Sequence, residues 1–208
     1  MSGAAVLHLD ESCLGNGREG ENPGGGGGLV EARSRSGRIQ RRDFYISAPA
    51  NTNNRMALAG AAEALRLLAA KEARLRVLIV SDSQYLVKGM REWVSGWASR
   101  GWRRKDGPIE NVELWKELVA SARLHDVEWT WVRGHQGHAK NEYANDLAVL
   151  AAREQRASGG LVASGFSDWL EARRARGRYL AYDPDEAFAA LEQRLAAGEA
   201  FPLADSVA

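Results

Sequence analysis

An uninterrupted apolar run at residues 76–81, followed directly by Asp82, limits the fold of this chain more than any other feature. The run RVLIVS does not alternate between polar and apolar residues, which is typical of a strand buried on both faces. Residues 4–10 are also apolar and end in Asp10, so they predict a second buried strand. Strands covered on both faces need helices around them, and the sequence therefore predicts an α/β domain.

The remaining patterns give the order of the elements. Residues 15–28 are dense in glycine and predict a long loop, after which Leu29 and Val30 open a second strand. A turn around Ser36 and Gly37 leads to a third strand, so the first three strands form an antiparallel meander. Apolar spacing predicts the third strand at residues 39–46 and the last strand at 126–133. It also predicts helices at 53–71, 83–94, 111–124 and 141–155.

The chain divides near residue 155. Residues 1–155 carry the order βββαβααβα, which predicts one mixed-sheet domain. Residues 156–208 hold a linker at 158–160 and two short helical patterns, at 166–176 and 183–195. This C-terminal extension either docks on the domain or forms an interaction element.

Charge and cysteine content exclude several classes of protein. Lys and Arg number 28 against 27 Asp and Glu, so attraction to a polyanion must come from local clusters. A single cysteine, Cys13, excludes a disulfide framework and a Cys-rich zinc site. Neither a secretory start nor an apolar stretch of roughly 20 residues is present. We therefore expect a cytoplasmic monomer with no membrane partner.

Asp10 and Asp82 both follow buried strands, where α/β sheets present functional groups. Two carboxylates that meet there could hold Mg²⁺. Alternatively, each Asp caps a turn or the following helix.

Motifs elsewhere in the chain decide between these readings. In chain order they are LDESCLGNG, TNNRM, SDSQYLVKGMREW, RGW with NVELW, WTWVRGHQGH and NEYANDLA. In order and spacing across residues 6–152 the set resembles the type 1 ribonuclease H family. The resemblance implies a five-stranded mixed sheet, three antiparallel strands then two parallel, flanked by helices. It also implies an endonuclease that cuts the RNA strand of an RNA/DNA hybrid with Mg²⁺, or alternatively Mn²⁺.

In this family four carboxylates hold two divalent ions, and the set is incomplete here. Asp10 and Asp82 match the first and third, whereas Ala57 and Asn145 stand where the second and fourth are expected. Anionic ligands allow two divalent ions to lie close together, so the loss of two should weaken binding of the second ion. Asn145 remains a candidate catalytic residue, as a neutral group.

Two further acidic residues are candidate metal ligands. Glu11 stands where the family usually has glycine, and Asp146 follows Asn145 directly. Strand alternation points Glu11 to the face opposite Asp10, and Asp146 lies about 100° around its helix from Asn145. Both are alternatively solvated surface charges.

His135 lies in the loop RGHQGHAKN and matches the family's histidine that assists proton transfer or product release near the metals. An imidazole titrates near neutral pH, which suits that role. Alone, a loop histidine is more often a surface residue.

Polar residues that match the family's substrate contacts complete the predicted site. They are Cys13, Asn16, Asn53, Asn54 and Gln84. Alternatively, these residues fill turn and N-cap positions.

The segment at 91–107 interleaves indoles with cations and resembles the basic protrusion that grips the DNA strand of the hybrid. Its candidate substrate-binding residues are Trp93, Trp102, Arg103, Arg104 and Lys105. Alternatively, Trp93 and Trp97 are core residues under a solvated basic loop. A further set, Arg173, Arg174, Arg176 and Arg178, could add non-specific affinity.

Two functions follow from these patterns. The first is endonucleolytic hydrolysis of the RNA strand of RNA/DNA hybrids by a divalent-metal mechanism with an altered ligand set. The second is hybrid or duplex binding without turnover, or with very slow turnover, as in a substrate-trapping variant.

Overall fold

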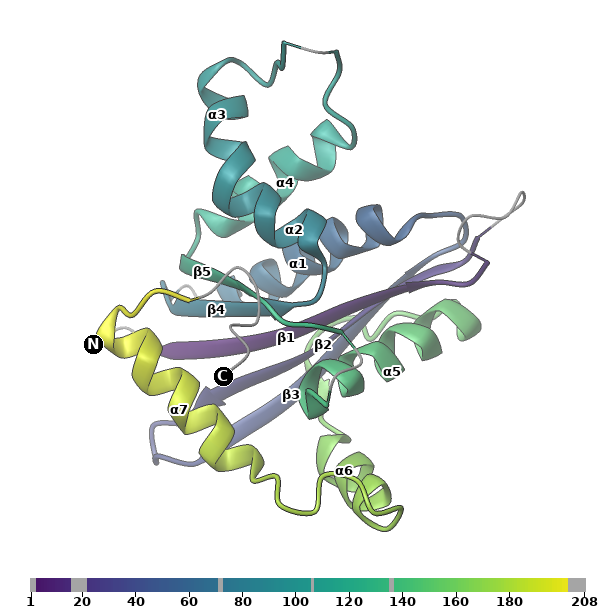
Figure 1. Cartoon of the computed structure of the whole chain (residues 1–208), viewed down its shortest axis with the longest axis vertical. Coiled ribbons are helices and arrows are strands. Elements are labelled where there is room, and N and C mark those ends of the chain that lie inside the picture. The colour runs from purple at the N-terminus through teal and green to yellow at the C-terminus, as the bar shows by residue number, and fades with distance from the viewer. Residues whose placement is uncertain (1–2, 16–21, 71–72, 106, 135–136, 202–208) are drawn as a thin grey trace.

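The structure is a computed structural model that describes residues 3–15, 22–70, 73–105, 107–134 and 137–201. A six-stranded sheet lies at its centre, in the order β5-β4-β1-β2-β3-β6 (Figure 1). The strands are β1 (Ala4–Cys13), β2 (Gly24–Arg33), β3 (Ile39–Ala48), β4 (Arg76–Ser81), β5 (Asp126–Trp131) and β6 (Val162–Ala163). β1, β2 and β3 are antiparallel, whereas β4 runs parallel to both β1 and β5. This confirms the predicted mixed sheet and adds β6 at its edge.

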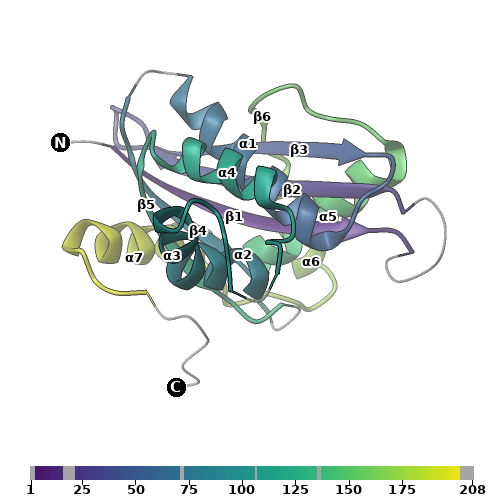
Figure 2. The same cartoon turned by 90° about the horizontal axis from the view of Figure 1, so that it is seen from above.

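Helices cover both faces of the sheet (Figures 1 and 2). They are α1 (Asn53–Ala69), α2 (Gln84–Lys88), the π-helical turn η1 (Gly89–Trp93), α3 (Val94–Ser99), α4 (Val112–Ala122), α5 (Ala139–Glu154), α6 (Phe166–Arg174) and α7 (Pro184–Ala197). α1 and α4 share one apolar cluster with Leu7 and Leu9 of β1. α7 shares another with Val6, on the opposite face of the same strand. In the described part of the chain, no helix is long and apolar enough to cross a membrane.

The glycine-dense segment is the clearest correction to the sequence prediction. Residues 24–28 were expected in a loop, but they form the first half of β2. A Cβ on Gly25 would lie 2.1 Å from the Ala148 carbonyl oxygen, and one on Gly27 would lie 2.5 Å from that of Ala144. The absence of side chains therefore lets α5 lie directly against the strand backbone.

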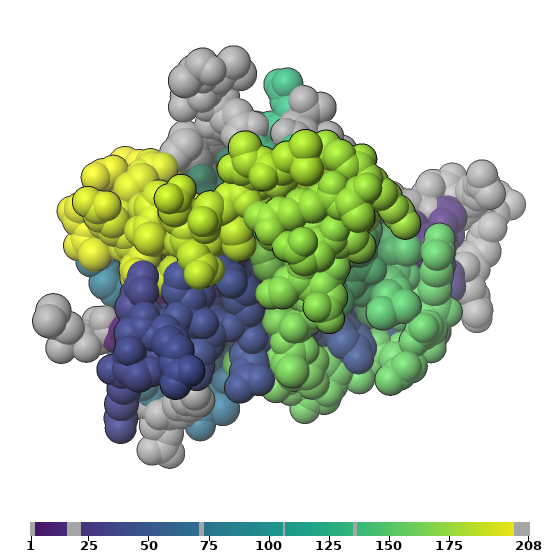
Figure 3. All heavy atoms as spheres, turned by 90° about the horizontal axis from the view of Figure 1, so that it is seen from below, coloured from purple at the N-terminus to yellow at the C-terminus, as the bar shows by residue number. Residues whose placement is uncertain are grey.

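The C-terminal extension docks on the domain. β6 pairs with β3 next to the predicted linker, where the Ser158 amide donates to the Tyr45 carbonyl (2.9 Å). Phe166 and Leu170 of α6 pack with Leu29 in a third apolar cluster. In Figure 3 the extension, in lime and yellow, forms a continuous layer against the β2–β3 hairpin in blue and α5 in green.

Candidate active site

Three carboxylates meet beside the end of β4, two of them from within β1, which continues past Asp10 and Glu11 to Cys13. Carboxylate oxygens of Asp10, Glu11 and Asp82 all lie within 4.8 Å of one another. β1 and β4 are parallel neighbours with Leu9 opposite Ser81, so the residues that follow this pair in each strand lie side by side. We call these three residues the acidic cluster.

Neighbouring groups fix the orientation of the acidic cluster. The backbone amide of Glu11 donates to Asp10 Oδ1 (2.7 Å), and Asn141 Nδ2 donates to Asp10 Oδ2 (3.1 Å). Asn141 Nδ2 also lies 3.3 Å from the Leu9 carbonyl oxygen, so the first turn of α5 is joined to the end of β1. Trp131 Nε1 donates to the Asp82 carbonyl (2.8 Å). The acidic cluster is therefore held by β1, β5 and α5 together.

Burial and mutual repulsion oppose the negative charges of the acidic cluster. Burial, followed by the charge of Asp82, raises the pKa of Asp10 to about 9 and that of Glu11 to about 8. A divalent cation bound between the carboxylates would remove this repulsion, and carboxylate oxygens are the ligands that Mg²⁺ and Mn²⁺ prefer. The residues present therefore fit a divalent metal site.

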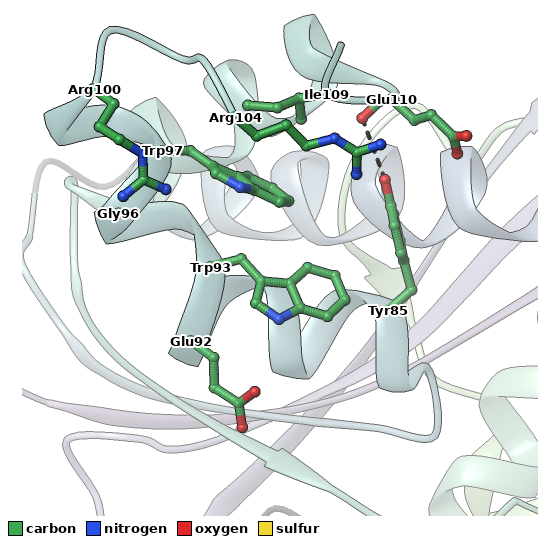
Figure 4. Close-up of a pocket in the computed structure, with 9 residues that line it drawn as sticks. All are labelled: Tyr85, Glu92, Trp93, Gly96, Trp97, Arg100, Arg104, Ile109 and Glu110. Carbon is green, nitrogen blue, oxygen red and sulfur yellow. Dashed lines mark hydrogen bonds between the residues drawn. The ribbon is translucent and has the colours of Figure 1, made fainter. Parts of the chain in front are cut away.

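A pocket of about 590 Å³ lies on the same segment as the basic loop (Figure 4). Its aromatic wall is formed by Tyr85, Trp93 and Trp97, with the ring centroids of the two tryptophans 5.7 Å apart. The guanidinium groups of Arg100 and Arg104 lie beside this wall, as Figure 4 shows. Glu92 and Glu110 also line this pocket, so its polar lining carries charges of both signs.

Comparison with known proteins identifies the family. Residues 2–153 match the family described as RNase H. The chain belongs to the RNase H family. A ribonuclease H of Pelobacter propionicus is 44% identical over 72% of this chain and 85% of its own length. Ribonuclease HI of Neisseria meningitidis serogroup B is 41% identical over 74% of this chain and 99% of its own.

A solved relative matches beyond the family region. The "Crystal structure of LC9-RNase H1, a type 1 RNase H with the type 2 active-site motif" is 56% identical, with a TM-score of 0.77 and coverage of 81% of each chain. The family assignment, the fold and the ribonuclease activity that the motifs implied are therefore confirmed.

Within the acidic cluster, Glu11 lies on the side of the sheet that α1 covers. This is the helix in which the RNase H family motif led us to expect a glutamate, at Ala57. Leu9 and Ala57 lie in one apolar cluster, and strand alternation places Glu11 on the same face as Leu9. The expectation that Glu11 points to the sheet face opposite Asp10 kept these two carboxylates apart, whereas their oxygens lie within 4.8 Å of each other and of Asp82. Ala57 itself is buried and continues the apolar face of α1.

Asp146 does not join the acidic cluster, so its prediction as a metal ligand was wrong. Its Oδ2 atom accepts from Trp169 Nε1 and from Arg173, both at 2.7 Å. This carboxylate therefore binds the C-terminal extension. Asn145 is half-buried one helical turn after Asn141, and its catalytic role remains a prediction.

Sequence reasoning missed two residues at the site. Asn141 was noted only as a helix start, yet its side chain contacts Asp10. A Cβ on Gly134 would lie 2.2 Å from Asp82 Oδ2, so the loop backbone approaches this carboxylate closely. The family motifs contained both residues but gave no sign of these contacts. Asn16 and His135 lie outside the described residues, and their roles remain predictions.

The other predicted substrate residues differ in exposure and in their place on the helices. Asn54 and Gln84 are exposed near the starts of α1 and α2, while Asn53 is half-buried. Thr52 and Ser83 cap these helices, so the N-cap reading does not apply to Asn53 or Gln84. Cys13 is buried, and burial, then Glu11, raises its pKa to about 11.

The basic segment combines packing with exposed charge. Trp93 is half-buried, and Trp102 packs against the main apolar cluster with a positive φ of 60°. Arg103, Arg104 and Lys105 are exposed.

The arginines of the extension have mostly structural partners. Arg173 pairs with Asp146, Arg174 with Glu171 and Arg178 with Glu142 at 2.6–2.9 Å. Three of the four predicted arginines are therefore paired with carboxylates, which argues against a basic nucleic-acid surface on the extension.

Proposed function

We propose that this chain hydrolyses the RNA strand of RNA/DNA hybrids with divalent ions held by Asp10, Glu11 and Asp82. The observation that carries the proposal is the convergence of these three partly buried carboxylates in a chain of the RNase H family. Glu11 supplies, from the strand, the carboxylate that α1 lacks at Ala57. The description of LC9-RNase H1 as a type 1 RNase H with the type 2 active-site motif fits such a departure.

The residues of the chain have separate tasks in this mechanism. Divalent ions, when held by these carboxylates, would supply activation of the attacking water and stabilisation of the leaving oxygen. Asp10 and Asp82 hold the ions from adjacent strands, and Glu11 completes the anionic set. Asn145 contributes a neutral oxygen from α5, and His135 moves protons or helps release the product. Mg²⁺ is the expected ion, with Mn²⁺ as the alternative.

The substrate surface extends from the acidic cluster to the basic segment. Arg103, Arg104 and Lys105 contact the phosphates of the DNA strand beside Trp93 and Trp102. Asn53, Asn54 and Gln84, at the starts of α1 and α2, contact the hybrid near the scissile bond. Cys13 and Asn16 contribute further contacts from the first strand and the loop that follows it in the sequence. A hybrid needs such separate contacts, because its strands differ in 2′-hydroxyls and in shape.

The basic segment can be tested without touching the acidic cluster. The double variant R103E/R104E should raise the KM for hybrid and reduce the slope of log Kd against log salt by about two, with kcat unchanged. Fluorescence anisotropy at several salt concentrations measures the slope. An unaltered slope would remove these arginines from the substrate surface.

Turnover is the deciding experiment for the function. Purified protein is incubated with a hybrid labelled on the RNA strand, in Mg²⁺ or Mn²⁺, beside Asp10→Asn as the matched control. We expect internal cuts in the RNA strand from the wild type alone. If the wild type cuts no faster than the control yet retains hybrid in a binding assay, the chain is a binding protein.

Light scattering tests the expected monomer, and the cytoplasmic location remains a prediction.

A further inference from the structure

A second group of ionisable residues lies near the acidic cluster and plays no part in the proposed chemistry. It consists of Glu31 with His8, Arg41 and Lys140, and we call it the Glu31 cluster. Lys140 Nζ lies 2.7 Å from Glu31 Oε2, Arg41 Nε lies 2.9 Å from Oε1, and His8 Nε2 lies 3.2 Å from Oε2. The four side chains come from β1, β2, β3 and α5, so one carboxylate joins four elements.

The Glu31 cluster is buried and electrostatically satisfied. Glu31 is fully buried and Lys140 is 3% exposed. Burial alone would raise the pKa of Glu31, but His8 and Lys140 outweigh it and lower that pKa to about 2. A buried carboxylate with this many partners restricts the positions of the elements that supply them, because loss of any partner leaves charge buried without compensation.

The C-terminal extension is attached to the Glu31 cluster at two points. Lys140 Nζ donates to the Pro184 carbonyl (2.9 Å), and Arg41 lies 2.5 Å from Asp185 Oδ1. Pro184 and Asp185 are the first residues of α7. The start of α7 is therefore joined to the start of α5 through one ammonium group.

Lys140 is directly followed by Asn141, whose side chain donates to Asp10 Oδ2. A continuous set of contacts thus runs from Pro184 through Lys140 and Asn141 to the acidic cluster. Outer-shell hydrogen bonds orient metal-binding carboxylates, and their loss typically weakens metal binding about 10- to 100-fold.

We propose that the C-terminal extension helps to build the metal site, because Lys140 anchors the first turn of α5 on α7 and Asn141 then orients the Asp10 carboxylate. Lys140 and Asn141 are positioning residues in this proposal. It rests on the proposed function for its reference to a metal, but it concerns a segment outside the region that matches the family, residues 2–153.

The test uses the full chain and measures metal binding directly. Mn²⁺ binding without nucleic acid is measured by calorimetry for the wild type, Asn141→Ala and Lys140→Met. Thermal unfolding is recorded for each, and so are the kcat, the KM for hybrid and the Mg²⁺ concentration for half-maximal rate. The matched control is Arg33→Met, which removes the 2.6 Å ion pair between the sheet and Glu192 of α7 without contacting α5.

We expect Asn141→Ala to raise the Kd for Mn²⁺ about tenfold and Lys140→Met to raise it about threefold or more. The half-maximal Mg²⁺ concentration should rise in parallel, with the KM for hybrid unchanged at saturating metal. Arg33→Met should lower the Tm and leave the Kd within about twofold, because it loosens α7 without touching Lys140. A Kd for Lys140→Met equal to that of the control would overturn the proposal.

Two further points keep the test decisive. If Lys140→Met does not fold, the paired variant E31Q/K140M removes both charges together and should show the same weaker Mn²⁺ binding. If the wild type binds Mn²⁺ but does not cut hybrid, the proposed function fails while the calorimetric comparison still tests the positioning role. If it cuts hybrid and all variants bind Mn²⁺ equally, the function stands and the positioning role fails.

Discussion

The acidic cluster and the Glu31 cluster lie two residues apart on β1, at Asp10 and His8, yet their electrostatics are opposite. Three carboxylates share the acidic cluster, and the pKa values of Asp10 and Glu11 rise to about 9 and 8. In the Glu31 cluster one carboxylate faces several nitrogen groups, and its pKa falls to about 2. Burial opposes the charged carboxylate in both clusters, but in the Glu31 cluster the neighbouring nitrogen groups outweigh it, whereas in the acidic cluster the neighbouring carboxylates add to it. The difference indicates that a bound cation would stabilise the ionised form of the acidic cluster.

The largest test of this comparison removes one charge from the acidic cluster. Asp10→Asn should lower hybrid cleavage by about a thousandfold, because a metal ligand is lost. In EDTA the same variant should raise the free energy of unfolding by about 2 kcal/mol, because the folded protein no longer has to keep a proton on a carboxyl that the unfolded chain releases at neutral pH. Activity assays and urea denaturation measure the two effects. A variant that is less active and also less stable would contradict the comparison.

The next test moves a carboxylate within the acidic cluster. Glu11→Gly should lower cleavage about a hundredfold, and adding Ala57→Glu in that background should recover at least about a tenth of the lost rate. The reason is that both positions lie on the face of the sheet covered by α1. Ala57→Glu in the wild-type background is the control and should give no gain. Failure of the relocated carboxylate to restore cleavage would mean that Glu11 acts other than as a metal ligand.

A smaller effect is expected from the Glu31 cluster. Glu31→Gln should lower the free energy of unfolding by about 2 kcal/mol at pH 7, because Lys140 and Arg41 lose the charge that compensates them. The sign is opposite to that for Asp10→Asn. Urea denaturation of both variants side by side gives the measurement, and equal signs would remove the contrast between the clusters.

The smallest test uses pH. Between about pH 4 and pH 9 the folded, metal-free protein holds protons on Asp10 and Glu11 that the unfolded chain has released, so stability should fall as pH rises. Mg²⁺ should reduce this loss most at high pH, because it binds the deprotonated carboxylates. The lowered pKa of Glu31 acts in reverse, and its stabilisation should be lost as pH falls from about 4.5 towards 2. Urea denaturation at pH 3, 5, 7 and 9, with EDTA or Mg²⁺, tests all three statements.

The sequence predicted the parts of the fold that are written in local patterns. The apolar run before Asp82 and the apolar spacing at 53–71 and 141–155 each produced an element with nearly the observed bounds. Residues 24–28 were misjudged because glycine usually marks a loop, whereas here it makes room for a helix that comes more than a hundred residues later. β6 was missed because a two-residue strand has no periodic pattern.

The candidate site was predictable where single motifs carry it. Asp10 and Asp82 follow from the ends of the apolar runs and from motif spacing, although β1 continues past Asp10 to Cys13, and their distance from Glu11 depends on how β1 lies beside the end of β4. The contact of Asn141 with Asp10 and the engagement of Asp146 by Trp169 arise only from the placement of α5 and α6. These contacts join residues far apart in the sequence, so local sequence patterns do not predict them.

The seat of α5 on bare strand backbone at Gly25 and Gly27 has a further consequence. Even a methyl group at either position would act as a wedge beneath the helix that carries Asn141 and Asn145, tilting it away from the strand that carries Asp10. The distance between α5 and the sheet thus depends on the absence of a Cβ atom at Gly25 and Gly27. A substitution at either glycine would therefore displace the site residues on α5 while every predicted catalytic side chain is still present in the sequence.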